Sequence, residues 1–548
     1  MKKSGGKTVR NIILTIVFAL LYFYFKLPAI NFKHPGFYGF FVVVMLFYCA
    51  LTIYTGKMLR ESVSGADLWY KIKKKCGVPL AIACALIVIQ IIGGIIGSPI
   101  IRASAYSKLL PMERGTFAED IAEISFDKIP MLDSTSADTL ANRKLGELSD
   151  LVSQFNVDPS SVQINFRDKP VRVTYLHYGD FFKWLNNSPK GIPAYMVIDM
   201  VTQEVTVPRL EKGMRYSPSE YFFRDVDRYL RFKYPTYIFS DTNLELNEEG
   251  EPYWVASVMT KRIGLFGGKD IEGAVLLNAV TGESTYLDVK DIPAWVDRVY
   301  DADLIIEQYD YYGRYHNGFF NSLFGQRGVT VTTDGYNYLA LDDDVWMYTG
   351  VTSVGGDESN IGFILVNQRT KEAKYYAIAG AEEYSAMNSA EGAVQQYRYS
   401  ATFPLLLNIS GQPTYFMALK DSSQLVKMYA MVNVQQYQIT ATGTTVAACK
   451  ENYLASLYNA GLIKPEDTGT SETPDSLTVT GEIAEIRSAV RAGSTVFYIR
   501  LEGDDFYYLI SVEDSELAAV LNEGDKVTLV SSATEGELRE AVSVVRAP

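Results

Sequence analysis

The segment 78–101 constrains this chain more than any other, because its 24 residues carry no formal charge. At about 1.5 Å per helical residue, such a segment is long enough to cross a bilayer core of about 30 Å. Two further apolar runs precede it, at 12–25, extending to about residue 32, and at 37–54. Each is close to the length of a spanning helix. Residues 1–101 are therefore predicted to form an anchor of three transmembrane helices.

Charge on the two flanks of these runs predicts their orientation. The amino-terminal tail and the loop between the second and third runs together carry ten lysines and arginines, against Lys26 and Lys33 near the connection 31–36. The positive-inside rule places those ten cations in the cytoplasm. Residues 102–548 are then extracytoplasmic, on a plasma membrane. A cleaved signal peptide is the rival interpretation of the first run, but no small-residue cleavage site follows it.

Gly93 and Gly97 form a Gly-x-x-x-Gly step within the third run. Such a step allows another helix to approach closely. Packing among the three helices of this chain is the favoured interpretation, and a homo-oligomer through Gly93 and Gly97 is the alternative.

Composition separates the anchor from the remainder. Residues 102–548 hold 39 lysines and arginines against 62 acidic residues, a net charge of −23. Such a surface repels phosphate backbones, which argues against nucleic acid, and it is compatible with cations, basic peptides or neutral glycans. Cys449 is the single cysteine beyond the anchor, so no internal disulfide is expected. A large exported region without disulfides fits a bacterial cell envelope.

Helical and strand patterns alternate after the anchor, so the fold class is predicted to be α+β with several domains. We expect a stalk at 102–138, a first α+β unit at 139–212, a second at 213–300, and a Tyr-rich β region with a third α+β unit at 301–463. The polar segment 464–476 has two prolines and no apolar period, which is typical of a linker. A small barrel follows at 477–548.

One hairpin turn recurs in this region. The pattern Asp/Asn-x-x-Thr-x-Glu occurs at 199–204, 278–283 and 367–372, each time between two extended runs. The first side chain is expected to accept hydrogen bonds from the backbone ahead of it, and Thr-x-Glu begins the return strand. Recurrence at intervals of about 80 to 90 residues indicates a repeated α+β unit.

The surroundings of the second turn are the most characteristic. A helix is predicted over 217–232, started by the capping box Ser217-Pro-Ser-Glu220. Strands 236–246 and 252–258 flank a turn that ends in Gly-x-Pro-Tyr-Trp, and a third strand ends in Asn-x-x-Thr-Gly-Glu. This arrangement resembles the PepSY domain over 217–287 and more faintly over 139–210. The resemblance implies accessory or inhibitory binding and supplies no catalytic residues. The third unit departs from the pattern, because its expected helix, 386–397, follows the third turn.

The last 72 residues carry about five strand signals and a short helix at 513–521, with glycines where strands bend. This pattern resembles an OB-type barrel. Many OB folds bind nucleic acid, but 477–548 holds six basic residues against thirteen acidic ones. Without a cationic groove, nucleic-acid binding is not expected.

Two groups of residues are candidate sites. The aromatic run Tyr309, Tyr311, Tyr312, Arg314, Tyr315 and His316 is suited to stacking on sugars or a peptide, although tyrosines also fill half-buried faces of sheets. The acidic residues Asp334, Asp342, Asp343 and Asp344 offer oxygen ligands to a hard cation, although a solvated turn at the end of a strand is the favoured interpretation. Three histidines and no His/Cys cluster provide no zinc motif, and no cofactor is predicted.

The sequence thus predicts a non-catalytic, membrane-anchored binding or scaffold protein of the bacterial envelope, with other envelope proteins or cell-wall components as partners. The alternative is an envelope hydrolase or glycan-processing enzyme that uses paired carboxylates, which sequence adjacency alone does not reveal. Transport is disfavoured, because the apolar runs contain no acidic residue.

Overall fold

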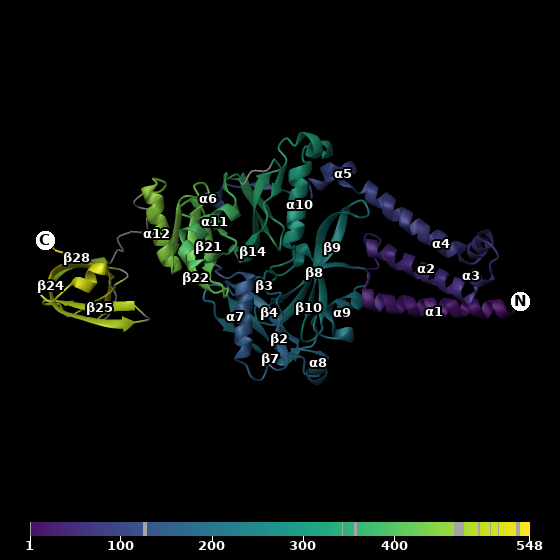
Figure 1. Ribbon diagram of the computed structural model, residues 1–548, viewed down its shortest axis with the longest axis horizontal. Coiled ribbons are helices and arrows are strands. Elements are labelled where there is room, and N and C mark those ends of the chain that lie inside the picture. Colours follow the sequence, from purple (N-terminus) through teal and green to yellow (C-terminus); the bar gives the residue numbers. More distant parts are fainter. Residues whose placement is uncertain are drawn as a thin grey trace. The chain divides into compact units, whose positions relative to one another are not determined.

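The computed structural model describes residues 2–123, 129–341, 343–355, 359–464, 476–491, 494–504, 506–512, 515–532 and 538–547. The chain divides into two compact parts, 1–453 and 454–548. The described residues of the first part form a helical anchor and four successive helix-and-sheet units, and those of the second form a barrel. Figure 1 shows the elements of both parts.

The anchor consists of α1 (Lys2–Lys26), α2 (Pro35–Thr55), the short α3 (Met58–Glu61) and α4 (Gly65–Ile96). Within them, Gly6–Lys26, Pro35–Thr55 and Gly65–Ile96 are long and apolar enough to cross a membrane. The prediction of an α+β chain with three such amino-terminal helices is therefore confirmed.

The third helix differs from its predicted bounds at both ends. Ser64 caps α4, with its hydroxyl accepting a hydrogen bond from the backbone N–H of Asp67 at 3.2 Å. The helix therefore begins at Gly65 and includes Lys71 and 73–75, which were expected in a loop. At the other end, Gly97 stops α4, and Pro99 begins a separate helix, α5 (Pro99–Tyr106). Proline is favoured in the first turn of a helix because it lacks an N–H. The uncharged run 78–101 is therefore divided between α4 and α5.

The Gly-x-x-x-Gly step contacts a β-hairpin rather than another helix. A Cβ atom at Gly93 would lie 2.7 Å from a ring carbon of Phe266, and one at Gly97 would lie 3.2 Å from the carbonyl oxygen of Ile263. The Phe266 ring also meets Tyr38 of α2 edge to face, 5.5 Å between centroids. The hairpin tip 264–266 therefore covers the surface at which close helix packing was expected. A homo-oligomer through these glycines stays a prediction that would require the hairpin to move.

The connection between the first two membrane helices also bonds to the large domain. The backbone N–H of Ile30 donates to the carbonyl of Pro235 at 2.7 Å, and Asn31 Nδ2 donates to the carbonyl of Thr236 at 2.8 Å. Lys33 Nζ donates to the carbonyl of Lys261 at 2.9 Å. The anchor is thus bonded directly to one helix-and-sheet unit.

Each helix-and-sheet unit has one main helix followed by antiparallel strands. Unit I comprises α7 (Ser134–Gly146), β2 (Phe155–Val157), β3 (Val162–Phe166), β4 (Lys169–Tyr178), α8 (Phe181–Asn187), β5 (Ile192–Asp199), β6 (Val205–Thr206) and β7 (Arg209–Met214). Unit II comprises α9 (Val226–Lys233), β8 (Ile238–Leu246), β9 (Pro252–Ile263), β10 (Gly267–Asn278) and β11 (Ser284–Asp288). The sheet of unit II has the order β11-β10-β9-β8, and in unit I β4 pairs β2, β3 and β5.

Units III and IV repeat the same order. Unit III comprises α10 (Ala302–Tyr315), β12 (Thr330–Thr332), β13 (Asn337–Leu341), β14 (Asp344–Ser353), β16 (Gly362–Asn367) and β17 (Ala373–Tyr376). Unit IV comprises α11 (Glu383–Ala393), β19 (Ser400–Ala401), β20 (Leu405–Ile409), β21 (Gln412–Lys420), β22 (Val426–Asn433) and β23 (Thr440–Gly443). The pair β15 (Ser359–Asn360) and β18 (Gly380–Ala381) lies between them in sequence, and α12 (Val446–Asn459) follows. In both sheets the two longest neighbouring strands are central.

The helix of unit III was not predicted. The structure forms α10 where a Tyr-rich β region was expected, because Asp301 caps the helix by accepting from the N–H of Leu304 at 2.7 Å. The third turn, 367–372, therefore belongs to a unit that begins with the helix α10. The unit expected at 386–440 is a fourth unit. The helix of unit II was predicted eight residues too early, since Asp225, rather than Ser217, is its cap.

The recurrent turns have the expected geometry. Oδ1 of Asp199, Asn278 and Asn367 each accepts hydrogen bonds from the second and third N–H groups ahead of it, at 2.8–3.0 Å. The threonine hydroxyl then accepts from the N–H of the glutamate two positions later, at 3.2–3.4 Å. Unit IV has the same first step, because Asn433 Oδ1 accepts from the N–H groups of Gln435 and Gln436.

Residues expected to form a stalk instead lie along the units. The two-residue strand β1 (Glu113–Arg114) pairs in parallel with β17 of unit III. Asn408 Nδ2 of unit IV donates to the carbonyl of Ile121 at 2.6 Å, and the N–H of Met131 donates to Met200 of unit I at 2.8 Å. The segment therefore connects three units.

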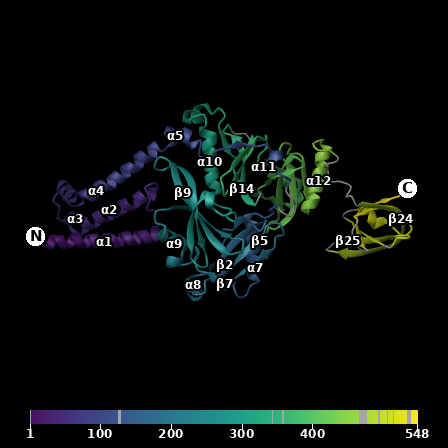
Figure 2. The same cartoon turned by 180° about the vertical axis from the view of Figure 1, so that it is seen from behind.

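The sheet of unit II is buried on both faces. Trp254, Ala256 and Val258 join a core with unit I, whereas Val255 joins a second core with α10 and the strands of unit III. Figures 1 and 2 both show α10 between β9 and β14. A strand buried on both faces loses the alternation of apolar and polar residues, which explains the nearly continuous apolar runs in this region.

The second part contains a closed barrel in the order β24-β25-β26-β28-β27. Its strands are β24 (Ser476–Arg491), β25 (Ser494–Leu501), β26 (Tyr507–Ser511), β27 (Lys526–Ser532) and β28 (Leu538–Arg546). A 3-10 helix, Glu516–Val520, stands where a short helix was expected. Most of the predicted linker, 465–475, lies outside the described residues.

Candidate functional site

The aromatic candidate residues lie on or directly after α10, but they do not form one exposed surface. Tyr309 is buried in the core between units II and III. Tyr311 packs edge to face on Tyr106 of α5, 4.7 Å between centroids, and its hydroxyl donates to Glu307 at 2.8 Å. Tyr315 stacks on Tyr311. This set therefore joins the helix after the last span to unit III.

The remaining members of that set are bonded to the helix itself. Arg314 forms an ion pair with Asp310 at 3.0 Å, one turn before it. His316 stacks near Tyr312, 6.0 Å between centroids, and its Nδ1 lies 3.2 Å from the carbonyl of Tyr312. The two residues of each pair are four positions apart, which is the spacing of neighbours on a helix and is visible in the sequence.

The acidic candidate residues do not form one site either, because each of those described has different contacts. Both oxygens of Asp344 bond the guanidinium of Arg369 at 2.7 Å, and its Oδ2 accepts from Asn367 Nδ2 at 2.8 Å. Asp343 accepts from Asn165 Nδ2 at 2.9 Å, Asp334 is exposed in a turn, and Asp342 lies outside the described residues. Among the described residues no group of three or more Asp, Glu, His or Cys side chains is placed to hold a metal ion. The arginine occupies the position that a cation at Asp344 would need.

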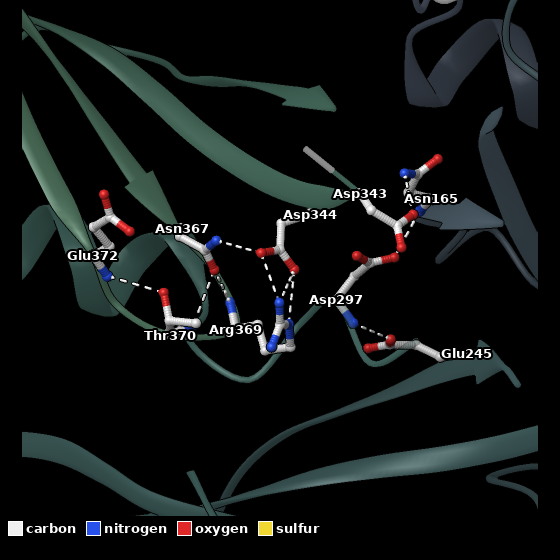
Figure 3. A network of polar contacts seen from close by, with 9 residues as sticks. All are labelled: Asn165, Glu245, Asp297, Asp343, Asp344, Asn367, Arg369, Thr370 and Glu372. Carbon is white, nitrogen blue, oxygen red and sulfur yellow. Dashed lines mark hydrogen bonds and ion pairs between the residues drawn. The ribbon is translucent and has the colours of Figure 1, made fainter. Parts of the chain in front are cut away.

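Instead, the structure brings together a buried polar group where units I, II and III meet. We call it the junction cluster, and Figure 3 shows its acidic part beside the Asn367 turn. Its members come from strands β3, β4 and β8 and from the segment between β11 and α10: Gln163, Asn165, Arg172, Glu245, Asp297 and Arg298. These residues stand far apart in the sequence, so only the packing of three units assembles them.

Hydrogen bonds link four members of the junction cluster in series, Asn165, Asp297, Glu245 and Arg298. Glu245 accepts from the backbone N–H of Asp297 at 2.7 Å and from that of Arg298 at 3.1 Å. The Asp297 carboxylate accepts from the backbone N–H of Asn165 at 2.6 Å. Arg298 Nη2 donates to the Tyr338 hydroxyl at 2.8 Å, with the guanidinium 4.7 Å from the Tyr338 ring centre. One series of contacts thus crosses from β3 of unit I to β13 of unit III.

Burial controls the protonation of the two acids. Glu245 and Asp297 are 0% and 1% exposed. Burial raises the pKa of Glu245, although the two backbone donors and Arg298 act in the opposite direction. Burial also raises the pKa of Asp297 well above its usual value, and the nearby charge of Glu245 raises it further. Two carboxyls this close and this deeply buried disfavour the ionisation of both at once.

Neighbouring carboxyls with raised pKa values also occur in the acid–base pairs of hydrolases. Such a pair must reach a substrate, and these two side chains are closed off from solvent. Several polar atoms here, including both side-chain atoms of Gln163 and Asp297 Oδ1, have no hydrogen-bond partner among the described residues. The junction cluster therefore joins three units, and in this conformation a substrate has no access to its two carboxyls.

The sequence contained a signal for Glu245 that was not used. The residue stands between Leu244 and Leu246 in a strand, where a charged side chain flanked by two buried leucines must itself be paired. The segment 236–246 was predicted only as a strand, with no role assigned to its glutamate. Nothing in the sequence near Asp297 pointed to its partner.

A second buried acid lies between units III and IV. Glu383 begins α11, is fully buried, and accepts from Asn360 Nδ2 at 3.4 Å. The same Asn360 nitrogen donates to the Tyr415 hydroxyl at 3.0 Å. The pKa of Glu383 is raised to about 7, chiefly by burial, with the charge of Glu382 adding to the rise and the hydrogen bond from Asn360 opposing it.

This raised pKa predicts a pH-dependent stability. An acid whose pKa is higher in the folded protein stabilises the fold below its unfolded pKa, and that stability is lost as pH rises through the folded pKa. The free energy of unfolding should fall by about 3 kcal/mol for this group between about pH 4.5 and pH 7.5. Chemical denaturation of wild type and Glu383→Gln over this range measures the difference. The slope should flatten in Glu383→Gln and be unchanged in Glu451→Gln, an exposed glutamate of α12.

An open cleft of about 640 Å³ adjoins Glu383 in sequence and in space. It is lined by β15, β18, α11 and the turn after β22, through Ser359, Gly380, Ala381, Ser385, Asn388, Ser389, Gln435 and Tyr437. Every one of these residues is uncharged, in a region that otherwise carries a large negative charge. Hydroxyls, amides and one exposed tyrosine ring are the groups that proteins use to bind neutral, hydroxyl-rich ligands.

Comparison with protein-family models and with curated proteins finds no match for this chain.

Proposed function

We propose that this protein is a non-catalytic, extracytoplasmic binding or scaffold protein, anchored in a bacterial plasma membrane. The single observation that carries the proposal is that the buried acids are committed to holding units together, while the open cleft between units III and IV is lined by uncharged hydrogen-bonding groups. The ten cations on one flank of the anchor support an extracytoplasmic location for the units.

The repeated order of helix, long strands and Asx turn supports the further proposal that units I to IV are PepSY-like. The closed barrel, in which β26 pairs in parallel with β28 and the other neighbours are antiparallel, supports an OB-like assignment. Both assignments suit modules that bind other molecules without transforming them.

The lining of the cleft specifies the chemistry of its ligand. A charged ligand would lack a countercharge among the eight lining residues, whereas a neutral glycan presents hydroxyl and amide groups that Asn388, Gln435 and the serines can pair. Tyr437 is 53% exposed and offers a ring face on which a sugar can stack. A neutral cell-wall glycan is therefore the proposed ligand class.

A second candidate function, a hydrolase that uses paired carboxylates, is favoured by one observation, the two neighbouring buried carboxyls of Glu245 and Asp297, whose pKa values are both raised by burial. It requires the junction cluster to open during the reaction.

Binding of a neutral glycan tests the proposal directly. The full chain in lipid nanodiscs should bind oligosaccharides of β-linked N-acetylglucosamine, and Tyr437→Ala should weaken binding about tenfold, the equivalent of about 1.4 kcal/mol. Isothermal titration calorimetry measures both affinities. Loss of one stacked ring accounts for an effect of this size.

Tyr397→Ala is the matched control, because Tyr397 is 54% exposed in the same unit but does not line the cleft. Its affinity should equal that of wild type. Equal binding by wild type and Tyr437→Ala, or no binding of the oligosaccharides, would contradict the proposed ligand and site. Turnover of the oligosaccharide that Glu245→Gln abolishes would instead establish the hydrolase.

A further inference from the structure

The exposed phenylalanines among the described residues of units I to IV lie in two places. Among the described residues after α5, all phenylalanines with highly exposed side chains lie in the segments 181–232 and 320–324. A soluble surface normally carries such residues singly, and a cluster of them marks an interaction site. Their distribution therefore calls for a common explanation.

The first cluster, which we call the α8 patch, combines the short helix α8 with the chain that leads into α9. Its exposed members are Phe181, Phe182, Leu185, Tyr221, Phe222, Phe223 and Phe232. Phe182 is 73% exposed, the highest value of the group. Phe181 meets Tyr221 at 5.4 Å and Trp184 meets Phe222 at 5.9 Å between ring centroids, so the α8 patch is one contiguous surface.

The α8 patch is continuous with the end of the first membrane span. Tyr24 meets Phe223 at 5.7 Å, and Phe23 meets Phe232 at 5.4 Å between centroids. Arg228 places its guanidinium 4.6 Å from the centre of the Tyr24 ring. Because Gly6–Lys26 is the span, these contacts lie at its terminal turn, where the span leaves the hydrocarbon. Figure 1 shows α9 at this end of α1.

The second cluster, Phe320, Leu323 and Phe324, is linked to α5, the helix that follows the last span. A ladder of rings leads to it from α5: Tyr106 to Tyr311, Tyr311 to Tyr315, Tyr315 to Phe319 and Phe319 to Phe320, at 4.7, 5.9, 6.1 and 5.8 Å between centroids. The α8 patch thus adjoins the end of the first span, and the second cluster is linked by rings to the helix that follows the last span.

A cleft beside the α8 patch has the polarity expected at a membrane surface. It measures about 530 Å³, and its walls combine Tyr24, Phe25 and Phe222 with Ser219, Asp225 and Arg228. The charge of the segment that holds the α8 patch also indicates a membrane surface. The stretch 181–233 carries nine lysines and arginines against six acidic residues, in a region whose net charge is −23. A locally basic surface next to the bilayer is attracted to anionic lipid headgroups.

From these contacts we propose that the α8 patch and the 320–324 cluster lie in the headgroup zone of the membrane that holds the anchor. Aromatic side chains concentrate at that depth because one part of the ring is apolar and another tolerates water. Two lipid contacts, one beside α1 and one beside α5, hold the large domain against the bilayer surface. The lipid is the occupant because the rings of the α8 patch extend the ring contacts of the first span, and those of the 320–324 cluster extend from the helix that follows the last span.

Depth measurement with nitroxide spin labels tests this directly. Of the described cysteines only Cys84 is exposed, so Cys84→Ser gives a background in which single cysteines can be labelled. Labels are placed by Phe182→Cys, Phe222→Cys and Phe324→Cys, with Tyr437→Cys as the control on unit IV. The full chain is reconstituted in vesicles of phosphatidylglycerol and phosphatidylethanolamine, and collisions with oxygen and with a water-soluble nickel chelate are recorded.

Oxygen partitions into the bilayer and the nickel chelate does not. The ratio of oxygen to nickel collisions should be about tenfold higher at the three patch positions than at the Tyr437 position, which corresponds to about 1.4 kcal/mol. A ratio equal to that of the control at all three positions would overturn the proposal. Labels shielded from both reagents would also overturn it, since they would indicate a protein neighbour, either a second copy or a partner.

Discussion

Glu245→Ala is expected to destabilise the first part of the chain by about 3–5 kcal/mol, because each buried donor left unpaired costs about 1–3 kcal/mol. The change leaves two buried backbone N–H groups, of Asp297 and Arg298, without an acceptor. It also leaves the Arg298 guanidinium in the interior without its anionic neighbour. Urea denaturation of the full chain in detergent, followed by near-ultraviolet circular dichroism, measures the shift in the free energy of unfolding.

Two further variants separate charge from hydrogen bonding. Glu245→Gln keeps one acceptor oxygen and the shape of the side chain, so its cost should lie well below that of Glu245→Ala. Glu249→Ala removes an exposed carboxylate of the neighbouring turn and should stay within about 0.5 kcal/mol of wild type. A Glu245→Ala protein as stable as Glu249→Ala would show that the junction cluster does not hold the units together.

The sequence was most informative where structure depends on neighbours in the chain. The turns at Asp199, Asn278 and Asn367 were predicted with their hydrogen bonds, because the acceptor and its donors lie within three residues. The apolar runs of the anchor were equally local. Neither the turns nor the apolar runs depend on residues that are distant in the sequence.

Helix starts were less predictable, because distant residues decide which candidate cap is used. Ser217 and Glu220 match a capping box, but Glu220 is drawn away by Tyr178 and Trp184 of unit I, which donate to its two oxygens at 2.8 Å. Burial raises the pKa of Glu220, and these bonds oppose that rise. Asp225 is left to cap α9. A local pattern was thus overridden by a contact about 40 residues away in the chain.

The candidate sites show the same limit. The aromatic set was identified by composition, but its helical spacing was read as a β region, and its role in joining α10 to α5 depends on Tyr106. The junction cluster joins Asn165, Glu245 and Asp297, which no spacing rule relates. The cleft between units III and IV could not be predicted, because unit III was not recognised as a separate unit.

Trp254→Ala tests whether units I and II form one cooperative structure. The indole lies in the core that both units share, meets Tyr175 of unit I edge to face at 5.1 Å, and donates from Nε1 to the carbonyl of Tyr216 at 2.8 Å. Loss of so large a buried side chain should cost about 3–5 kcal/mol. If the units unfold together, a single transition should move to lower urea, detected alike by near- and far-ultraviolet circular dichroism.

The opposite face of the same strand supplies the critical comparison. Val255 points into the core with unit III, so Val255→Ala should move the same transition by a smaller amount, because fewer buried atoms are removed. Trp69→Ala, which removes a tryptophan that is 62% exposed on α4, should leave it unchanged. Two separate transitions, each sensitive to only one of the first two variants, would mean that the sheet of unit II does not couple its neighbours. A single transition that both variants shift requires that this sheet, buried on both faces, transmits stability from unit I to unit III.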